Sequence, residues 1–309
     1  MRPQPFLGLL FLLITSFPAL AAGGWGSPVM VGQLDATLLP EASGIAQSIL
    51  DPGRIYHVND RGAVPSVVVT QASGAGARRV LLDTEALVDA EDLATGPCPD
   101  HGSCLYIADI GDNNFQRSFV TVYVVRETRD LVEPLPIAFA VTISYSDGRA
   151  HNAEGFSIHP SGDAYILTKE TPAIFYRVSL SALQTQTKLI VEPVASINLL
   201  PWLDGTDKPN KLIPTGLAIR GDGAQLVILT RAAGLTLDID LFGIGGGAVI
   251  DLNRLIARGE AFAARLPMLR VPQSEAVTYI NGSTAILYSS EAAKPEVTTV
   301  PLVMIPRLR

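Results

Sequence analysis

The stretch Asp89-Ala-Glu-Asp-Leu-Ala94 organises the interpretation of this chain, together with the run Leu105-Tyr-Ile-Ala-Asp-Ile-Gly-Asp-Asn-Asn114. A carboxylate-rich start leads into a short apolar strand, and a second apolar strand then runs out into carboxylates and amides. The same order returns four times, in Glu41-Ala-Ser-Gly-Ile-Ala46, Asn152-Ala-Glu-Gly-Phe-Ser157, Pro214-Thr-Gly-Leu-Ala-Ile219 and Ser274-Glu-Ala-Val-Thr-Tyr279. Such internal similarity predicts a repeat architecture.

Each repeat continues into short runs rich in Val, Ile, Leu, Tyr and Thr, separated by turn signals such as Asp147-Gly and Asn281-Gly. Short strands at this spacing predict an all-β fold, a single β-propeller of four-stranded antiparallel blades. The first three predicted units are 45–48, 54–58, 66–70 and 79–82; 92–95, 105–110, 120–125 and 137–145; and 155–159, 164–168, 174–178 and 188–194.

The last two units are less regular. Residues 216–220, 225–230 and 235–241 are predicted strands, and Gly243-Ile-Gly-Gly-Gly247 then leads into a predicted short helix at 252–264. We interpret the glycine run as a crossing between outer strands, because it lacks the lysine of a phosphate-binding loop. The fifth unit has strands at 276–279, 285–289 and 297–303, and residues 29–39 are expected to supply its outer strand and close the ring. Five blades are readable, and a sixth within 194–214 or 243–270 is an alternative.

The composition limits the classes of partner. The chain has 309 residues, of which 48% are hydrophobic and 17% charged, so it is too apolar to be disordered. Its formal net charge of -7, without any Lys/Arg cluster, argues against a nucleic-acid surface. No later apolar run is long enough to span a bilayer. We expect a monomer whose partner is a small anionic or polyhydroxylated ligand, or an envelope glycan or protein.

The first residues have the form of a signal peptide. Arg2 precedes an apolar run, Pro18 breaks it, and Ala19-Leu-Ala21 offers a small-x-small cleavage site. We therefore expect residues 1–21 to be removed, 22–309 to form the propeller domain, and the mature protein to be secreted or periplasmic.

Export makes the two cysteines interpretable. Cys98 and Cys104 enclose Pro-Asp-His-Gly-Ser and predict a disulfide in an oxidising compartment. The alternative, a metal site of both cysteines with His101, lacks a fourth ligand in the sequence.

Propeller geometry predicts where the polar residues meet. In an antiparallel blade the start of the innermost strand and the end of the second strand lie at the same end. One mouth of the central channel should therefore collect residues from both positions: Glu41, Glu91, Glu154, Thr215 and Glu275 from the strand starts, and Asp60, Asp109, Lys169, Arg231 and Glu291 from the strand ends. Asp89 and Asn113 belong to the same predicted mouth.

Carboxylates gathered this closely repel one another unless a cation neutralises them, and Ca²⁺ prefers several oxygen ligands. Lys169 and Arg231 would face an anionic ligand, and His151 at the head of the third unit is a candidate general base. The predicted metal ligands are Glu41, Glu91, Asp109, Glu154, Glu275 and Glu291. The alternative is structural: each Glu accepts backbone hydrogen bonds and locks the ring, while Asp109, Asp112, Asn113 and Asn114 act as turn residues.

The motifs quoted above, with Val58-Asn-Asp-Arg-Gly62 and Asn152-Ala-Glu-Gly155, resemble those of a family of exported bacterial β-propellers similar to esterase-like phytase, gluconolactonase and TolB-type propellers. The resemblance covers nearly all of the mature chain. It implies divalent-metal-dependent hydrolysis of phosphoesters or lactones at the channel mouth. Thr215 departs from the acidic pattern in its blade. The alternatives are a non-catalytic propeller that binds a glycan, peptide or envelope protein, and a purely structural scaffold.

Overall fold

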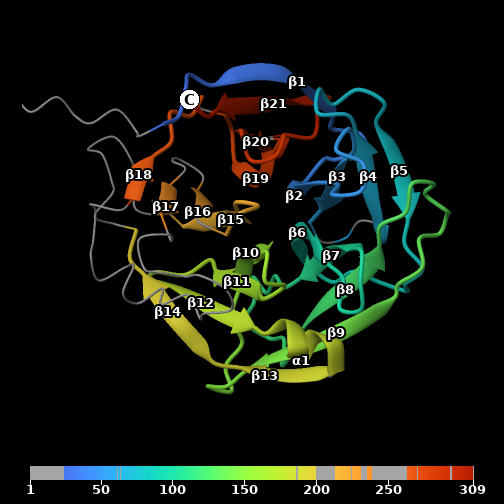
Figure 1. Cartoon of the computed structure of the whole chain (residues 1–309), viewed down its shortest axis with the longest axis vertical. Coiled ribbons are helices and arrows are strands. Elements are labelled where there is room, and N and C mark those ends of the chain that lie inside the picture. Colours follow the sequence, from blue (N-terminus) through green and yellow to red (C-terminus); the bar gives the residue numbers. More distant parts are fainter. Residues whose placement is uncertain are drawn as a thin grey trace, which may run out of the picture.

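The computed structural model describes residues 24–308, except 61, 63, 186, 200–212, 224, 231–234, 239–262, 270 and 293. Within these residues the strands form five sheets arranged around a centre, an all-β architecture with the fold of a β-propeller (Figure 1). Short runs of Val, Ile and Leu form the strands because their branched side chains suit a pleated surface buried between neighbouring sheets.

The sheets follow one another along the chain. Their strands are β2 (Ala42–Gln47), β3 (Ile55–Asn59), β4 (Ser66–Thr70) and β5 (Arg78–Leu81); β6 (Ala90–Pro97), β7 (Ser103–Asp109), β8 (Val120–Arg126) and β9 (Phe139–Tyr145); β10 (Ala153–Ile158), β11 (Ala164–Thr168), β12 (Ala173–Val178) and β14 (Pro193–Ile197); β15 (Pro214–Ile219), β16 (Gln225–Thr230), β17 (Leu235–Asp238) and β18 (Ala263–Arg265); and β19 (Ser274–Ile280), β20 (Ala285–Ser290) and β21 (Thr299–Pro306). The first strand of each set lies nearest the centre in Figure 1, and these five inner strands contact one another in a closed ring.

The ring is closed by the beginning of the chain. Strand β1 (Val29–Asp35) pairs antiparallel with β21 and forms the outer strand of the last sheet, as the sequence predicted. Because β1 and β21 come from opposite ends of the described chain, this pairing fastens the first sheet to the last and leaves β21 no free edge.

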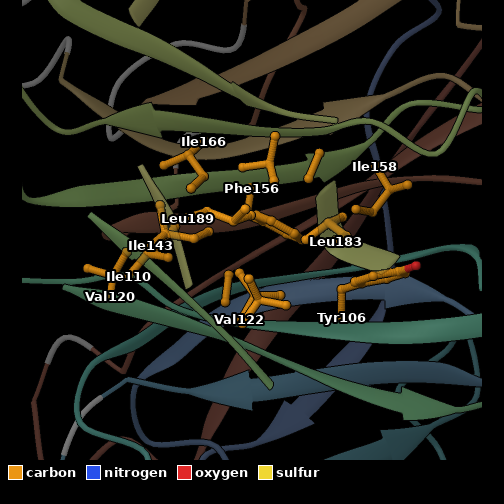
Figure 2. Packing of buried hydrophobic residues seen from close by; sticks show 14 of the residues in the cluster. Tyr106, Ile110, Val120, Val122, Ile143, Phe156, Ile158, Ile166, Leu183 and Leu189 are labelled. Atoms are coloured by element: carbon orange, nitrogen blue, oxygen red, sulfur yellow. The ribbon is translucent and has the colours of Figure 1, made fainter. Parts of the chain in front are cut away.

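Two outer segments differ from the sequence-based prediction. The strand expected at 188–194 is divided: β13 (Lys188–Val191) pairs in parallel with β9 of the second sheet, and β14 completes the third. A short helix, α1 (Leu180–Thr185), was not predicted and precedes β13. Leu183 of the helix and Leu189 of β13 are buried in the core between the second and third sheets, which explains why this segment covers the outside of both (Figure 2).

The irregular fourth unit is described only in part. The predicted helix at 252–264 lies outside the described residues except at its end, where Ala263 and Ala264 belong to strand β18 and the helix prediction is wrong. Of the segments proposed for a sixth blade, the described parts include β14 and β18, which are the outer strands of the third and fourth sheets.

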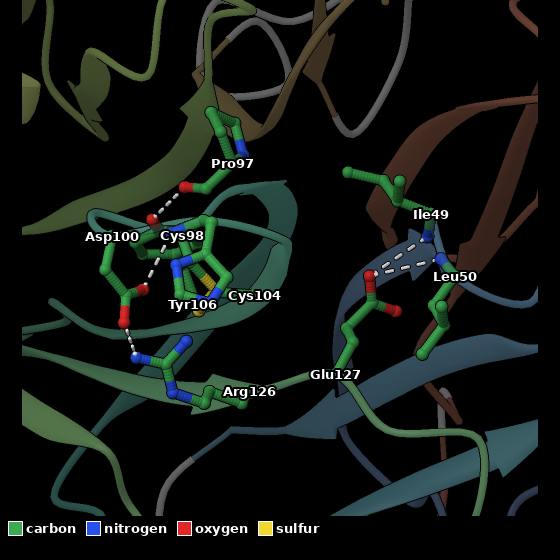
Figure 3. Close-up of a disulfide and its surroundings, with 10 residues drawn as sticks. Ile49, Leu50, Pro97, Cys98, Asp100, Cys104, Tyr106, Arg126 and Glu127 are labelled. Carbon is green, nitrogen blue, oxygen red and sulfur yellow. Dashed lines mark hydrogen bonds and ion pairs between the residues drawn. A yellow bond between two sulfur atoms is a disulfide. The ribbon is translucent and has the colours of Figure 1, made fainter.

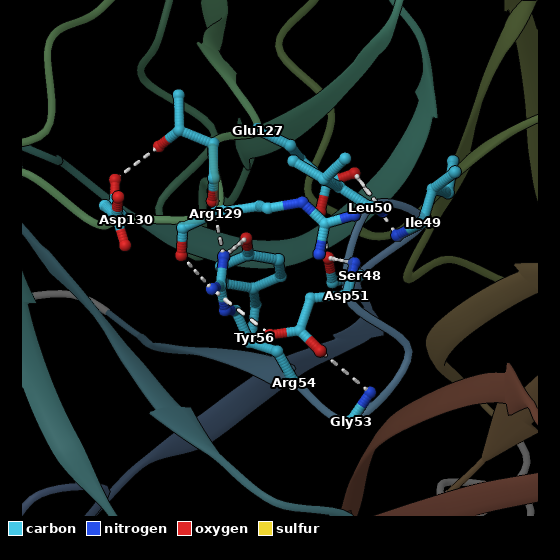
Figure 4. Close-up of polar contacts among 11 residues, drawn as sticks. Ser48, Ile49, Leu50, Asp51, Gly53, Arg54, Tyr56, Glu127, Arg129 and Asp130 are labelled. Carbon is cyan, nitrogen blue, oxygen red and sulfur yellow. Dashed lines mark hydrogen bonds and ion pairs between the residues drawn. The ribbon is translucent and has the colours of Figure 1, made fainter.

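Polar contacts at the ends of the strands also join neighbouring sheets. Arg54 donates to the carbonyl oxygens of Thr128 and Arg129 at 2.8 and 2.6 Å, and Glu127 accepts from Ser48 and from the backbone nitrogen of Ile49 (Figure 4). These contacts link the β2–β3 turn to the segment after β8, so the first two sheets are fixed to one another at the end where their inner strands finish.

His57 in β3 is fully buried. Its Nε2 lies 2.9 Å from Thr70 Oγ1, and the Thr70 hydroxyl already donates to the carbonyl oxygen of Gln71. Nε2 therefore carries the proton, and Nδ1 is an acceptor with no hydrogen-bond partner among the described residues. Burial lowers the pKa of His57 from 6.5 to about 3, so the folded protein keeps this ring neutral.

Acid should therefore destabilise the fold through His57. The unfolded chain binds a proton here below pH 6.5 and the folded chain does not until about pH 3, so stability is fully present above pH 6.5 and is lost as the pH falls towards 3. The loss is at most about 1.4 kcal/mol per pH unit. Urea unfolding at pH 7, 5.5 and 4.5 should show a smaller acid loss in a His57→Gln variant than in the wild type. Equal losses in the two proteins would contradict this assignment.

Candidate functional site

Every inner strand carries a β-bulge at the same place. The register shifts once in each pairing of an inner strand with the next strand. The residue skipped is the third of the first three sequence repeats quoted above and the second of the last two. A bulge turns a side chain away from the regular alternation of the strand. The skipped residues are all polar and buried: Ser43, Glu91, Glu154, Thr215 and Glu275.

This register corrects the sequence-based alignment of the first repeat. Glu41 occupies the position of Asp89, not that of Glu91, because Ala42 pairs with Asn59 as Ala90 pairs with Asp109. Glu41 is exposed, and Ser43 takes the bulge position in the first sheet.

The polar residues predicted at the ends of the second strands also do not share one position in the register. Asp60, Lys169 and Glu291 each follow the last paired residue of their strand, whereas Asp109 is itself that paired residue. Asp109 accepts hydrogen bonds from the backbone nitrogens of Val88 and Asp89 and from the Arg117 guanidinium, at 2.9, 2.9 and 2.7 Å. These bonds match the structural alternative for Asp109. Arg231 lies outside the described residues.

The loop after Asp109 is held by its own side chains. Asp112 accepts from the backbone nitrogens of Gln116 and Arg117 at 3.0 and 2.7 Å, as a turn residue does. Asn113 accepts from Asn152 at 3.1 Å, and Asn152 accepts from the backbone nitrogen of Asp112 at 2.8 Å. Asn113 thus helps to fasten the second sheet to the third.

Three carboxylates meet at the channel mouth. One oxygen each from Asp60, Asp89 and Glu91 lies within 4.8 Å of the others, and we call these three residues the acid cluster. Asp60 follows β3, Asp89 immediately precedes β6 and Glu91 is in β6, so the cluster lies between the first two sheets. Glu91 Oε2 accepts a hydrogen bond from Ser43 Oγ at 2.9 Å, and Oε1, which is buried, has no hydrogen-bond partner among the described residues.

Gly111 packs directly against the carboxylate oxygens of Asp89 and Glu91. A methyl group at this position would lie 2.5 Å from both Asp89 Oδ2 and Glu91 Oε1. The glycine is therefore needed for its lack of a side chain. A small space bounded by hard oxygen donors, one of them unbonded, has the chemistry of a divalent-cation site.

The electrostatics of the acid cluster favour an added positive charge. Burial raises the pKa of Glu91 well above its usual value, and the nearby charges of Glu154, Asp60 and Asp89 raise it further, while Lys169 lowers it. The Lys169 ammonium forms an ion pair with Glu154. Lys169 thus neutralises one bulge carboxylate of the ring, and the cluster lies beside this pair.

The remaining predicted residues do not join the acid cluster. Thr215 Oγ1 donates to the carbonyl oxygen of Ser274 at 2.7 Å and links the fourth sheet to the fifth. Glu291 accepts from Gln273, and Glu275 is buried at the bulge of β19.

His151 stands between two carboxylates. Its Nδ1 lies 2.8 Å from Glu170 and its Nε2 lies 3.0 Å from Asp147, with the Tyr176 hydroxyl 3.1 Å away. The ring of Tyr145 meets the imidazole edge-on at a centroid distance of 4.8 Å. Both ring nitrogens are therefore occupied, which holds the imidazole in place.

Asp92 is a buried group that sequence reasoning did not assign. Its carboxylate accepts from the backbone nitrogens of Leu93 and Phe156 at 2.8 Å and of Leu217 at 3.4 Å, and so contacts three of the five inner strands. Burial raises its pKa, and the three hydrogen bonds oppose that rise. The equivalent residues are Gly44, Gly155, Gly216 and Ala276, so the signal in the sequence was one carboxylate among four small residues.

The predicted disulfide is present. Cys98 and Cys104 are bonded across the β6–β7 hairpin with a Cα–Cα distance of 5.1 Å (Figure 3). Beside it, Asp100 and Arg126 form an ion pair on the surface. The hairpin lies at the opposite end of β6 from the acid cluster, so the disulfide stabilises a turn away from the candidate site.

Solved structures with a similar fold belong to several kinds of protein. Regucalcin from Agrobacterium tumefaciens, described as calcium-binding, is 15% identical with a TM-score of 0.47 over 91% of this chain and 96% of that chain. The PQQ-bound aldose sugar dehydrogenase of Streptomyces coelicolor is 8% identical with a TM-score of 0.46 over 92% and 100%. Kuenenia stuttgartiensis hydrazine synthase is 18% identical with a TM-score of 0.40. The similarity covers 88% of the present chain but only 64% of the hydrazine synthase chain.

These similarities are too distant to assign a metal, a substrate or an activity. No protein-family model and no curated protein sequence matches the chain. The resemblance to exported propellers therefore stays a prediction. Among the helices of the described residues, none has the length and apolar character needed to cross a membrane.

Proposed function

We propose that the chain is an exported, five-bladed propeller, one blade for each of the five sheets that the described residues form, and that it binds a divalent cation at Asp60, Asp89 and Glu91. The observation that carries the proposal is the unbonded, buried Glu91 Oε1 in a space that Gly111 leaves open between carboxylates. Ca²⁺ is the preferred ion because the donors are carboxylate oxygens, which this cation favours. The disulfide supports an oxidising compartment.

Hydrolysis of phosphoesters or lactones is the activity that best fits such a site. A bound divalent cation would polarise a phosphoryl or carbonyl oxygen. Lys169 provides positive charge beside the acid cluster for an anionic substrate, and its ion pair with Glu154 fixes its position. Arg231, which follows the equivalent strand of the fourth sheet, is proposed to act in the same way.

A second candidate is cation-dependent binding of a glycan, peptide or envelope protein without turnover. It is favoured by the state of His151 and Lys169, whose nitrogens are engaged by carboxylates and do not project as free acid–base groups. The two candidates share the cation site and differ only in turnover.

Calorimetric titration of the chelator-treated mature protein with Ca²⁺ tests the site. The wild type should bind the ion saturably, and Glu91→Gln should weaken binding at least about tenfold, which corresponds to about 1.4 kcal/mol. Glu41→Gln, a change of the same chemistry at an exposed position, should leave binding unchanged. If Ca²⁺, Mn²⁺ and Zn²⁺ all fail to bind the wild type, the metal-site proposal is wrong and a scaffold or cation-independent binding propeller remains.

Turnover separates the two candidates once cation binding is established. The protein loaded with Ca²⁺ is assayed on 4-nitrophenyl phosphate and on a small lactone. Hydrolysis that Glu91→Gln abolishes would support the hydrolase, and a bound cation without hydrolysis would favour the binding propeller.

A further inference from the structure

The channel has a second mouth of different character. The inner strands begin at the mouth that holds the acid cluster and run towards the other face, where a cavity of about 420 Å³ opens. Its walls are the final residues of β2, β6, β10, β15 and β19 and the turns after them, so all five sheets contribute. We call it the channel-end cavity.

The channel-end cavity is separated from the acid cluster by a constriction. A methyl group on Gly44 would lie 2.8 Å from the Asp92 Cα atom, one on Gly155 would lie 2.9 Å from Leu217 Cβ, and one on Gly216 would lie 3.0 Å from the carbonyl oxygen of Glu275. The inner strands therefore converge at this level, where Asp92 hydrogen-bonds across three of them. A ligand in the cavity would not contact the acid cluster.

The walls of the cavity are uncharged. Among the described residues that line it there is no Asp, Glu, Lys or Arg, and the titratable side chains are His159 and Tyr279. Burial lowers the pKa of His159, which favours its neutral form. This mouth therefore differs sharply from the first one, which gathers carboxylates and Lys169.

Polar side chains of the cavity wall already form hydrogen bonds with backbone groups of neighbouring sheets. Thr95 Oγ1 donates to the carbonyl oxygen of Gln47 at 2.8 Å, and Ser157 Oγ and Ser283 Oγ accept from the backbone nitrogens of Ile219 and Gly221 at 3.0 Å. Much of the remaining lining is apolar: Ile45, Ile49, Leu93, Ile158, Leu217 and Val277.

We propose that the channel-end cavity is a binding site for an uncharged small molecule with an apolar body. Its volume is within the range of about 300–1,000 Å³ typical of small-molecule sites. A charged ligand would lose its hydration without meeting a counter-charge, whereas an apolar one gains by leaving water. The inner strands are sheet edges, and their backbone groups can hydrogen-bond a neutral polar substituent.

Two fluorescent probes that differ by one sulfonate group test the proposal. N-phenyl-1-naphthylamine is uncharged, and 8-anilino-1-naphthalenesulfonate carries a sulfonate on the same framework. The wild type should bind the uncharged probe saturably at one site and the sulfonate at least about tenfold more weakly, because the sulfonate finds no positive charge in the wall. This comparison needs no variant.

A substitution that fills the cavity locates the probe. Thr278 lines the cavity in β19, and Thr278→Phe should weaken binding of the uncharged probe at least about tenfold. Thr299→Phe, the same change at an exposed position of the same sheet, should leave binding unaltered. Glu91→Gln and removal of Ca²⁺ should also have no effect, since both act beyond the constriction. Absence of saturable binding to the wild type, equal affinity for both probes, or full binding by a folded Thr278→Phe protein would overturn the proposal.

Discussion

Replacing Gly111 by alanine is expected to weaken divalent-cation binding about 100-fold, or about 2.8 kcal/mol. The added methyl group would lie 2.5 Å from Asp89 Oδ2 and Glu91 Oε1, so both carboxylates would have to leave the positions in which they face the cation. Gly111 is not among the glycines with a positive φ angle, so alanine fits its backbone. Calorimetric titration with Ca²⁺ measures the loss.

The matched control is Gly53→Ala in the β2–β3 turn. A methyl group added at Gly53 would have Asp51 Oδ1 as its nearest neighbour at 3.4 Å, which is an ordinary contact. The φ angle of Gly53 is also not positive. The control should bind Ca²⁺ as the wild type does. Unchanged affinity for Ca²⁺ in a folded Gly111→Ala protein would show that the cation is bound at another place.

Replacing Asp92 by alanine is expected to lower the free energy of unfolding by about 3–5 kcal/mol. The backbone nitrogens of Leu93, Phe156 and Leu217 would lose the carboxylate that accepts their hydrogen bonds. Asp92 is buried, so water does not readily replace it. Such a buried donor without a partner costs about 1–3 kcal/mol. Because these nitrogens lie on three different inner strands, the loss weakens contacts between sheets. Urea unfolding followed by far-ultraviolet circular dichroism measures it.

Two variants make the result specific. Asp92→Asn keeps an oxygen acceptor of the same size and should cost about half as much as alanine. Asp100→Ala removes a carboxylate whose ion pair with Arg126 is on the surface, where solvent screens it, and should unfold at nearly the same urea concentration as the wild type. If Asp92→Ala unfolds at the same urea concentration as Asp100→Ala, Asp92 does not support the ring.

Much of the fold could be predicted from the sequence because its signals are local. Alternating apolar runs and Gly/Asn turns marked the strands, and 66–70, 164–168 and 225–230 match β4, β11 and β16 to the residue. The pairing of β1 with β21 followed from the need to cover a sheet edge. The prediction was wrong where a tertiary contact decides the structure. Leu183 and Leu189 are buried in the core between two sheets, and no local pattern indicates that β13 pairs with β9 of the preceding sheet.

The candidate site stays a prediction, and its register was wrong at the first repeat. The repeats predicted that polar residues gather at one mouth, and oxygens of Asp60, Asp89 and Glu91 lie within 4.8 Å of one another. Of these three, only Glu91 was among the predicted metal ligands. Glu41 was aligned by residue type with Glu91, whereas the bulge places Ser43 there, and a bulge leaves no mark in a single sequence. The role of Gly111 depends on a distance between two loops, which sequence spacing does not contain.

The most direct test of the cation site is the position of a bound ion. Crystals of the mature protein grown with Mn²⁺ give an anomalous signal that marks the ion independently of any assumed ligand. We expect a peak within about 2.0–2.6 Å of oxygens from Asp60, Asp89 and Glu91, as for hard cations with oxygen ligands. A peak at other residues, or none in crystals whose Mn²⁺ is in excess, would contradict it.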